Sequence, residues 1–266
     1  MYDEYKNKTK ERGSAFVKLR RLLASAAMGI FMLSVLTGCT TAEQNKTTAA
    51  EGLDELGMIT VIAREEGSGT REVFAESLGF YDGSTGRDCT TGDARWAENG
   101  NEVIDLVAED EAAIGYVSAG MLKDEDKKNL HTVTVDGSDL ERSFYLAYSG
   151  KLSELELDFL TYVESAGQEI VGKNYTTVGK VTSFLSGKPT GNIKIGGSSS
   201  VFGLMQELAD AYMKQNPNAF IEVIKTDSTN GLTGAMSGIY DFGMASRDLK
   251  DYEKQLLEYE VIAKDE

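Results

Sequence analysis

The stretch REEGSGTR, which runs from Arg64 to Arg71, combines the residue types that bind small anions. It follows the apolar residues 58–63, a run typical of a buried strand, and it precedes a helix-like segment. Its glycines let the backbone approach a ligand closely, because glycine has no Cβ. Its serine, threonine and arginines supply hydrogen-bond donors. Such a turn at the start of a helix predicts an anion cradle of free N–H groups.

The same plan of strand, hydroxyl-rich turn and helix recurs later in the chain. A predicted strand at 193–195 leads to Ser198–Ser200. Apolar residues then follow with the spacing of one helix face, at positions 201, 204, 205, 208 and 212. Asn216 and Pro217 stop this predicted helix.

Two more junctions follow this plan. A predicted strand at 220–224 leads to Ser228 and Thr229, and then to a short helix with apolar positions 232, 235, 236 and 239. In DFGMASRDLK, Ser246 is predicted as the N-cap of a last helix, with Asp248 in its first turn.

Each hydroxyl residue has an ordinary interpretation as a helix cap, but four junctions together favour a shared site. In an open parallel sheet these turns emerge at the carboxyl ends of the strands, where ligands bind. Several helix starts aimed at one point select an anion without a positive surface. Arg64 and Arg247 would add bidentate, charge-assisted hydrogen bonds.

The composition excludes a nucleic-acid-binding role. The chain has 266 residues, 41% of them hydrophobic, which is enough for one large or two small domains. Its formal net charge is −16, and because the first 21 residues contribute +4, the rest carries −20. So acidic a body repels nucleic acid and anionic lipid, yet it permits one small anion held by local dipoles.

The N-terminus is typical of an export signal. Basic residues 18–21 lead into the uncharged residues 22–36, a stretch of signal-peptide length. Small residues then stand directly before Cys39, which resembles the lipobox of bacterial lipoproteins, where cleavage leaves a lipid-modified cysteine. An uncleaved anchor helix is the alternative. We expect a lipoprotein signal peptide at 1–38 and a polar tether at 39–56.

Other chemistry-bearing residues are scarce. Cys89 has no partner if Cys39 carries lipid, so we expect no intrachain disulfide. His131 is the single histidine, which rules out a multi-histidine metal site. The motifs HExxH, GxxxxGK[ST] and GxSxG are absent from the sequence. The sequence therefore predicts no enzyme, no cofactor and no metal site.

Five segments resemble, nearly word for word, the signatures of the phosphate-binding lipoproteins of ABC phosphate importers. They are REEGSGTR, GSSSV, DSTNG, DFGMASRDLK and VIAKD, and the match runs from Met58 to Glu266. The resemblance implies an α/β fold of the type II periplasmic-binding-protein kind. In that fold two lobes are joined by two crossover strands, and the ligand lies in the cleft between the lobes.

Carried over to this chain, the resemblance places the first α/β lobe at 57–142, the second at 143–262 and the start of a crossover at 263–266. In most members GSSSV precedes REEGSGTR, so the order here resembles a circular permutation. Family members continue past VIAKD with further elements of the first lobe, whereas this sequence ends at Glu266. We therefore expect an apparently truncated chain with a well-formed second lobe and an incomplete first lobe.

The resemblance also implies which residues contact phosphate. Those that match the family motifs are Arg64, Ser68, Gly69, Thr70, Ser199 and Ser228. After DFG some relatives have an aspartate that accepts the phosphate proton. This chain has Ser246 and Arg247 there, and they are the candidate phosphate contacts at this position. Asp227 is the nearest carboxylate in the matched loops that could serve as this acceptor, and Glu66 could instead orient Arg64.

The expected function is that of a non-enzymatic lipoprotein, anchored by lipid at the extracytoplasmic face of the bacterial cell membrane. It would capture inorganic phosphate and deliver it to an ABC transporter permease. Two alternatives stay open. The ligand could be another tetrahedral oxyanion such as sulfate, or the chain could be a sensor or surface lipoprotein that has lost its ligand.

Overall fold

A computed structural model of the chain describes residues 57–265, except 83–86, 124, 134 and 136–139. The expected signal peptide at 1–38, the lipidation site Cys39 and the tether at 39–56 lie outside the described residues. Within the part that is described, no helix combines the length and the apolar character needed to cross a membrane.

The first part of the described chain contains a small parallel sheet with the strand order β4-β1-β5. Its strands are β1 (Thr60–Arg64), β4 (Arg95–Ala97) and β5 (Ala113–Ile114). Two helices follow its strands, α3 (Gly69–Ser77) and α4 (Gly100–Glu109). The short elements are the antiparallel pair β2 (Tyr81–Asp82) and β3 (Arg87–Asp88) and the 3-10 helices η1 (Ala119–Met121) and η2 (Asp126–Lys128).

The core of this part is small. Its fully buried members are Ile62, Ala97, Val103 and Leu106. They connect β1 and β4 to one face of α4, which begins at an N-cap asparagine: the side chain of Asn99 accepts hydrogen bonds from two backbone N–H groups. Burial of each large side chain here contributes roughly 1.5–3 kcal/mol to folding.

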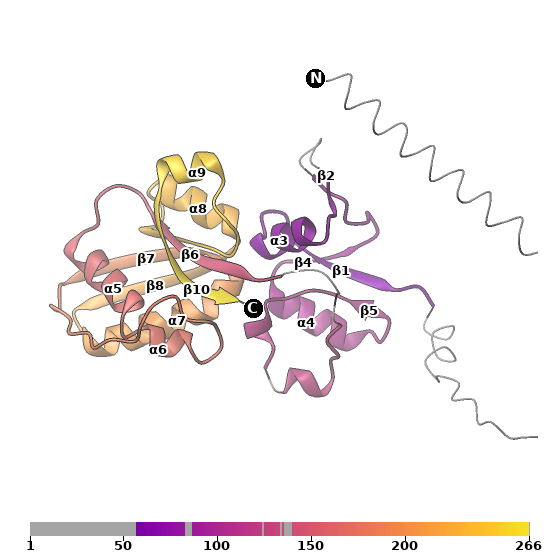
Figure 1. Cartoon of the computed structure of the whole chain (residues 1–266), viewed down its shortest axis with the longest axis horizontal. Coiled ribbons are helices and arrows are strands. Elements are labelled where there is room, and N and C mark those ends of the chain that lie inside the picture. Colours follow the sequence, from indigo (N-terminus) through magenta and orange to yellow (C-terminus); the bar gives the residue numbers. More distant parts are fainter. Residues whose placement is uncertain (1–56, 83–86, 124, 134, 136–139, 266) are drawn as a thin grey trace, which may run out of the picture. The chain divides into compact units, whose positions relative to one another are not determined.

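The second part is a five-stranded mixed sheet with the order β10-β6-β9-β7-β8 (Figure 1). Its strands are β6 (Arg142–Tyr148), β7 (Gly191–Ser198), β8 (Ala219–Thr226), β9 (Phe242–Ala245) and β10 (Glu258–Asp265). β8, β7 and β9 are parallel, whereas β6 runs antiparallel to both β9 and β10. The carboxyl ends of the three parallel strands therefore meet at one edge, as ligand-binding α/β sheets require.

Helices cover both faces of this sheet. They are α5 (Glu154–Glu164), α6 (Gln168–Val171), α7 (Ser199–Gln215), α8 (Ser228–Met236) and α9 (Asp251–Leu256). The alternation of β6 assigns the faces: Phe144 and Leu146 pack in the cluster of α5, α6 and α7, while Tyr145 and Ala147 pack with α8. Figure 1 shows α8 and α9 on the opposite side of the sheet from α5, α6 and α7.

The helix that the apolar spacing predicts after Ser200 is confirmed. α7 buries Val201, Leu204, Met205, Leu208 and Tyr212 and ends directly before Asn216, as the spacing indicates. Its apolar face packs on β7 and β8 in the larger core.

Two details of the later junctions are wrong in the sequence prediction. Ile239 lies beyond the end of α8 and is 61% exposed, because Gly238 adopts φ +72° and ends the helical path. Ser246 does not cap α9. That helix begins only at Asp251, and its first turn is fixed by the Lys250 backbone N–H, which donates to Glu253 Oε2 at 2.7 Å. Buried Leu249 holds the intervening segment against the sheet.

Candidate functional site

Three helices begin next to one another at the predicted site. At Gly69, the first residue of α3, a Cβ would lie only 2.5 Å from Ser228 Oγ and 2.9 Å from Ser246 Oγ. Thr70 Oγ1 lies 2.9 Å from Ser200 Oγ, in the first turn of α7. Helix starts carry free N–H groups and a partial positive charge, so this convergence creates a local region that attracts anions within an acidic protein.

Hydroxyl groups that follow the three parallel strands contact one another directly. Ser198 Oγ donates to Ser246 Oγ at 2.9 Å, and the Ser246 N–H donates to Ser228 Oγ at 3.1 Å. Ser228 Oγ and Ser246 Oγ are 3.4 Å apart. All three serines are buried. Buried hydroxyls at the carboxyl edge of a parallel sheet form a set of donors and acceptors that can rotate toward a ligand.

Arg64 supplies the positive charge of the cluster. It is 1% exposed, and its Nη2 donates to Ser199 Oγ at 2.9 Å. Nε and Nη2 donate to the two carboxylate oxygens of Glu65, both at 2.7 Å. Nη1 is buried and has no hydrogen-bond partner within the described part of the chain. A buried guanidinium N–H without a partner is costly, so this donor is the clearest indication of a ligand.

The carboxylate beside Arg64 is not the one that the sequence offered. Glu66 is exposed, and Glu65 forms the bidentate pair. The planar fork of arginine matches a carboxylate. The pair with Glu65 uses Nε and Nη2 and leaves Nη1 as the nitrogen without a partner within the described residues.

The start of α7 is less occupied than those of its neighbours. Its N-cap, Ser198, makes no side-chain capping bond. By contrast, Ser68 caps α3 by accepting from the Arg71 N–H, and Asp227 caps α8 by accepting from the Asn230 N–H at 2.9 Å. The first N–H groups of α7 therefore face the cluster without competition from a capping side chain.

Asp227, which the sequence offers as an acceptor for the phosphate proton, has a structural role because both of its carboxylate oxygens accept from Asn230. Besides capping α8 it accepts from the Asn230 side-chain amide, and it packs against Gly67, where a Cβ would lie 2.6 Å from Asp227 Oδ1. Gly67 has φ +85°, so the turn requires glycine for both its conformation and its space. Its carbonyl accepts from the Thr229 N–H, which links the REEGSGTR turn to α8.

Arg247 lies beside the cluster, but acidic groups occupy its guanidinium. Nη1 and Nη2 bind the two oxygens of Glu253 at 2.8 and 2.9 Å. Nε forms an ion pair with Glu72 Oε2 on α3 at 3.0 Å, although it makes no hydrogen bond within the described residues. Burial alone would lower the pKa of Arg247, but its hydrogen bonds to Glu253 and the charge of Glu72 raise the pKa. Arg247 therefore connects α3 to α9 as a permanently charged group.

The structure brings six of the eight predicted residues into one cluster: Arg64, Gly69, Thr70, Ser199, Ser228 and Ser246. Ser68 directly precedes Gly69, and its side chain caps α3. Ser198 and Ser200, which the sequence names within the hydroxyl junction Ser198–Ser200, also join the cluster. Sequence reasoning missed the roles of Glu65 and Arg142, and the pair of glutamates hints at the first. No local pattern indicates Arg142, since it begins a strand 72 residues from its partner Thr70.

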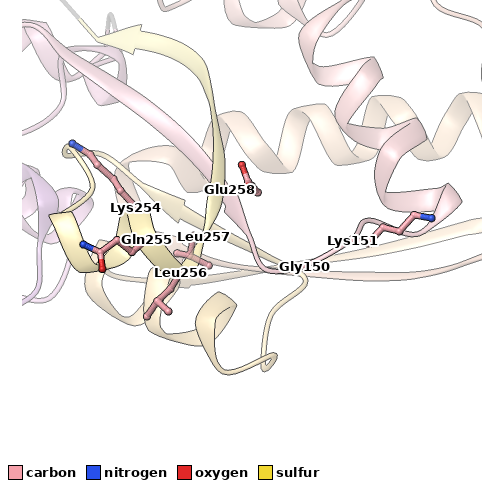
Figure 2. Close-up of a pocket in the computed structure, with 7 residues that line it drawn as sticks. All are labelled: Gly150, Lys151, Lys254, Gln255, Leu256, Leu257 and Glu258. Carbon is pink, nitrogen blue, oxygen red and sulfur yellow. The ribbon is translucent and has the colours of Figure 1, made fainter.

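Other candidate sites are weak. The described residues contain no group of three or more His, Cys, Asp or Glu side chains arranged to hold a metal ion. A surface pocket lies where α9 leads into β10, beside the loop after β6 (Figure 2). Its lining includes Lys151, Lys254 and Glu258. It adjoins the end of β6 opposite Arg142, and none of the clustered hydroxyls lines it.

One family model and several known proteins match the chain. The family described as a PBP superfamily domain matches residues 182–266. The chain is 33% identical over 262 residues to the phosphate-binding protein PstS 2 of Streptococcus pneumoniae serotype 4, covering 94% of this chain and 88% of that protein. It is 32% identical over 250 residues to PstS 2 of Streptococcus agalactiae serotype V, covering 89% and 83% of the two chains.

A solved structure is similar as well. The phosphate-binding protein of a phosphate ABC transporter from Streptococcus pneumoniae TIGR4 superimposes with a TM-score of 0.62 at 33% identity, over 79% of this chain and 86% of that one. Because one collinear alignment spans almost all of this chain, the segment order that begins with REEGSGTR is shared with the pneumococcal PstS 2. The predicted α/β periplasmic-binding-protein fold and the predicted relationship are confirmed. The chain belongs to the PstS family of phosphate-binding proteins.

Proposed function

We propose that this protein captures inorganic phosphate and delivers it to an ABC importer at the extracytoplasmic face of the cell membrane. The observation that carries the proposal is the buried guanidinium of Arg64, whose Nη2 donates to Ser199 Oγ at the start of α7 and whose Nη1 has no partner within the described residues. The relatives that this chain resembles over most of its length are phosphate-binding proteins.

In this proposal phosphate contacts Arg64, Ser68, Gly69, Thr70, Ser199 and Ser228. Helix N–H groups and hydroxyls donate to the anion oxygens, and Arg64 adds a charge-assisted bond. Ser246 supports the set through its bonds to Ser198 and Ser228. We assign Arg247 a positioning role, because Glu253 and Glu72 occupy its guanidinium.

Binding and release then require the cluster to open. The hydroxyls bond to one another at 2.9–3.4 Å, so an entering anion exchanges these contacts for its own. We propose lobes at 57–142 and 143–262, with the strands β6 and β10 and the crossover that starts at 263–266 as the hinge. Closure of two lobes over a ligand is a common motion of binding proteins, and a permease would recognise the closed form.

Cys39 would carry the lipid anchor that holds the protein at the membrane. No catalysis is part of the proposal: ligand binding, closure and docking suffice for delivery. The acidic charge of the body, −20 outside the first 21 residues, opposes nucleic-acid binding.

Sulfate is the competing ligand, for a reason that the geometry supplies. Phosphate near neutral pH carries a proton and sulfate carries none, so a free carboxylate in the site would favour phosphate. Two carboxylates that adjoin the cluster already have partners: Glu65 accepts from Arg64, and Asp227 accepts from Asn230. Discrimination between phosphate and sulfate would then depend on hydroxyl groups. A hydroxyl oxygen can accept a hydrogen bond from the phosphate OH, but it repels sulfate less than a carboxylate does.

Isothermal titration calorimetry tests the proposal. We expect phosphate to bind at one site per chain and sulfate to compete more weakly. Equal binding of both anions would make the protein a general oxyanion binder. Binding of neither would contradict the proposal and favour a protein that has lost its ligand. Hydrolysis of a generic phosphoester above background would contradict the non-enzymatic role.

A further inference from the structure

A second buried polar network adjoins the site and involves residues that the proposed contacts do not include. Arg142, at the start of β6, donates from Nε and Nη2 to Asp265 Oδ2, at 3.1 and 2.9 Å. Asp265, near the end of β10, also accepts from Ser118 Oγ at 2.6 Å. Arg142, Asp265 and Ser118 are each at most 8% exposed. The network thus joins two neighbouring strands to the segment after β5.

The free end of the Arg142 fork reaches the anion site. Its Nη1 donates to Thr70 Oγ1 at 2.7 Å, and Thr70 Oγ1 lies 2.9 Å from Ser200 Oγ. Thr70 is 6% exposed and lies in the first turn of α3. One side of the Thr70 hydroxyl is therefore held by arginine, and the other side faces the start of α7.

The chemistry of the guanidinium fixes how Thr70 can act. Arginine donates five N–H groups and accepts no hydrogen bond, so the Thr70 hydroxyl hydrogen cannot point toward Arg142. It is free to point to the remaining side, where Ser200 Oγ lies 2.9 Å away and either hydroxyl can be the donor. An anion needs donors, and Arg142 keeps this hydroxyl directed as one. Asp265 balances the charge of Arg142, which allows the arginine to stay buried.

We propose that Arg142 is a positioning residue of the anion site, which orients the Thr70 hydroxyl as a donor toward the bound anion. The inference rests on the proposed function, because it assigns Thr70 to the ligand. It adds a role for a side chain that does not itself touch the anion.

A double-mutant cycle on phosphate affinity tests this role. Arg142→Met removes the donor and keeps much of the side-chain length, and Thr70→Val removes the hydroxyl with little change of shape. We expect each single variant to weaken phosphate binding on the order of 10-fold. The double variant should bind about as weakly as Thr70→Val alone, since Arg142 acts through Thr70, rather than on the order of 100-fold more weakly than wild type. If Arg142→Met does not fold because Asp265 is left unpaired, Arg142→Met combined with Asp265→Asn replaces it in the cycle.

Ser118→Ala is the matched control, since it removes a buried bond to Asp265 one step farther from the site. It should lower the melting temperature and leave the phosphate Kd within about 2-fold. Additive losses in the cycle, or a loss for Ser118→Ala equal to that for Arg142→Met, would overturn the positioning role while the proposed function stands. If the wild-type chain does not bind phosphate, the proposed function fails, and this inference fails with it.

Discussion

At the scale of single residues, the partners of the three Arg64 nitrogens indicate where an anion can bind. Glu65 occupies Nε and one bond of Nη2, Ser199 takes another, and Nη1 is left buried without a partner in the described structure. Removing a charge-assisted partner from a buried site costs more than removing an exposed one, because no water replaces it.

Arg64→Lys should therefore weaken phosphate binding although it keeps the positive charge. Lysine has one compact ammonium group and cannot hold Glu65, Ser199 and an anion with the planar fork of arginine. We expect a loss of roughly 10- to 100-fold in affinity by calorimetry. Lys173→Arg, at an exposed ion pair with Glu207, is the control and should leave the affinity unchanged. Wild-type affinity in Arg64→Lys would show that the fork does not bind the anion.

Gly69 offers a steric test at the same scale. A Cβ at this position would lie 2.5 Å from Ser228 Oγ and 3.1 Å from the Ser246 backbone carbon. Gly69→Ala should push α3 away from the start of α8 and from Ser246, lower stability by about 1–3 kcal/mol and weaken phosphate binding on the order of 100-fold.

Gly203→Ala is its control, because a Cβ at Gly203 meets nothing within 4 Å. This variant lies inside α7 and should gain about 0.5–1 kcal/mol of stability, since alanine is the better helix former. Its affinity for phosphate should equal that of wild type. Equal affinity in both glycine variants would mean that the close approach of α3 is not needed for binding.

At the scale of elements, the sequence predicts those features that are set locally. The spacing of Val201, Leu204 and Leu208 gives α7 its buried face, and Asn216 its end. The error at Ile239 arises because the positive φ of Gly238 overrides an apolar position at helical spacing. The error at Ser246 arises because this residue bonds to Ser198 and Ser228 instead of starting a helix. Both depend on contacts or conformations that periodicity does not encode.

The same limit applies to the site. Motif matches indicate six clustered residues, but which groups pair with the charged side chains depends on the tertiary structure. Glu65 in place of Glu66 for Arg64, and Arg142 for Thr70, follow only from the folded arrangement. Sequence reasoning finds the groups that touch a ligand more readily than those that hold these groups in place.

The N-cap of α8 provides a prediction at this scale. Asp227→Ala removes the acceptor of the Asn230 N–H and should lower stability by about 1 kcal/mol, or about 2–4 °C in melting temperature. Asp227→Asn should keep most of the stability, because asparagine caps helices as well as aspartate. Thermal unfolding by circular dichroism measures both variants. Equal melting temperatures for the alanine and asparagine variants would show that Asp227 does not stabilise α8 as a cap.

At the scale of the whole molecule, buried ion pairs join α3, the segment after β9, and α9. Burial alone would raise the pKa of Glu253, but hydrogen bonds from Arg247 and from the Lys250 N–H outweigh it and lower the pKa below its usual value of 4.5. The charged form is therefore favoured by folding. Its contribution to stability is fully present above pH 4.5 and is lost as the pH falls through the lowered pKa of the folded state.

Melting temperatures between pH 7 and pH 3 test this linkage. The wild type should lose stability below about pH 4.5, and Glu253→Gln should start from a lower melting temperature at pH 7 and fall less steeply. Glu154→Gln, an exposed first-turn change in α5, serves as the control and should follow the wild-type slope. Identical slopes in wild type and Glu253→Gln would contradict a stabilising role of the Arg247–Glu253 pair.

The central claim is that helix starts far apart in the sequence hold one tetrahedral anion, and the position of that anion tests it most directly. A crystal of the chain grown with arsenate in place of phosphate would locate the anion by the anomalous scattering of arsenic. We predict one arsenate, located by its arsenic atom, whose oxygens lie within hydrogen-bond distance of Arg64 Nη1 and of the Thr70, Ser199 and Ser228 hydroxyls. Arsenic located only elsewhere, for example in the pocket beside Lys151 and Lys254, would contradict the account.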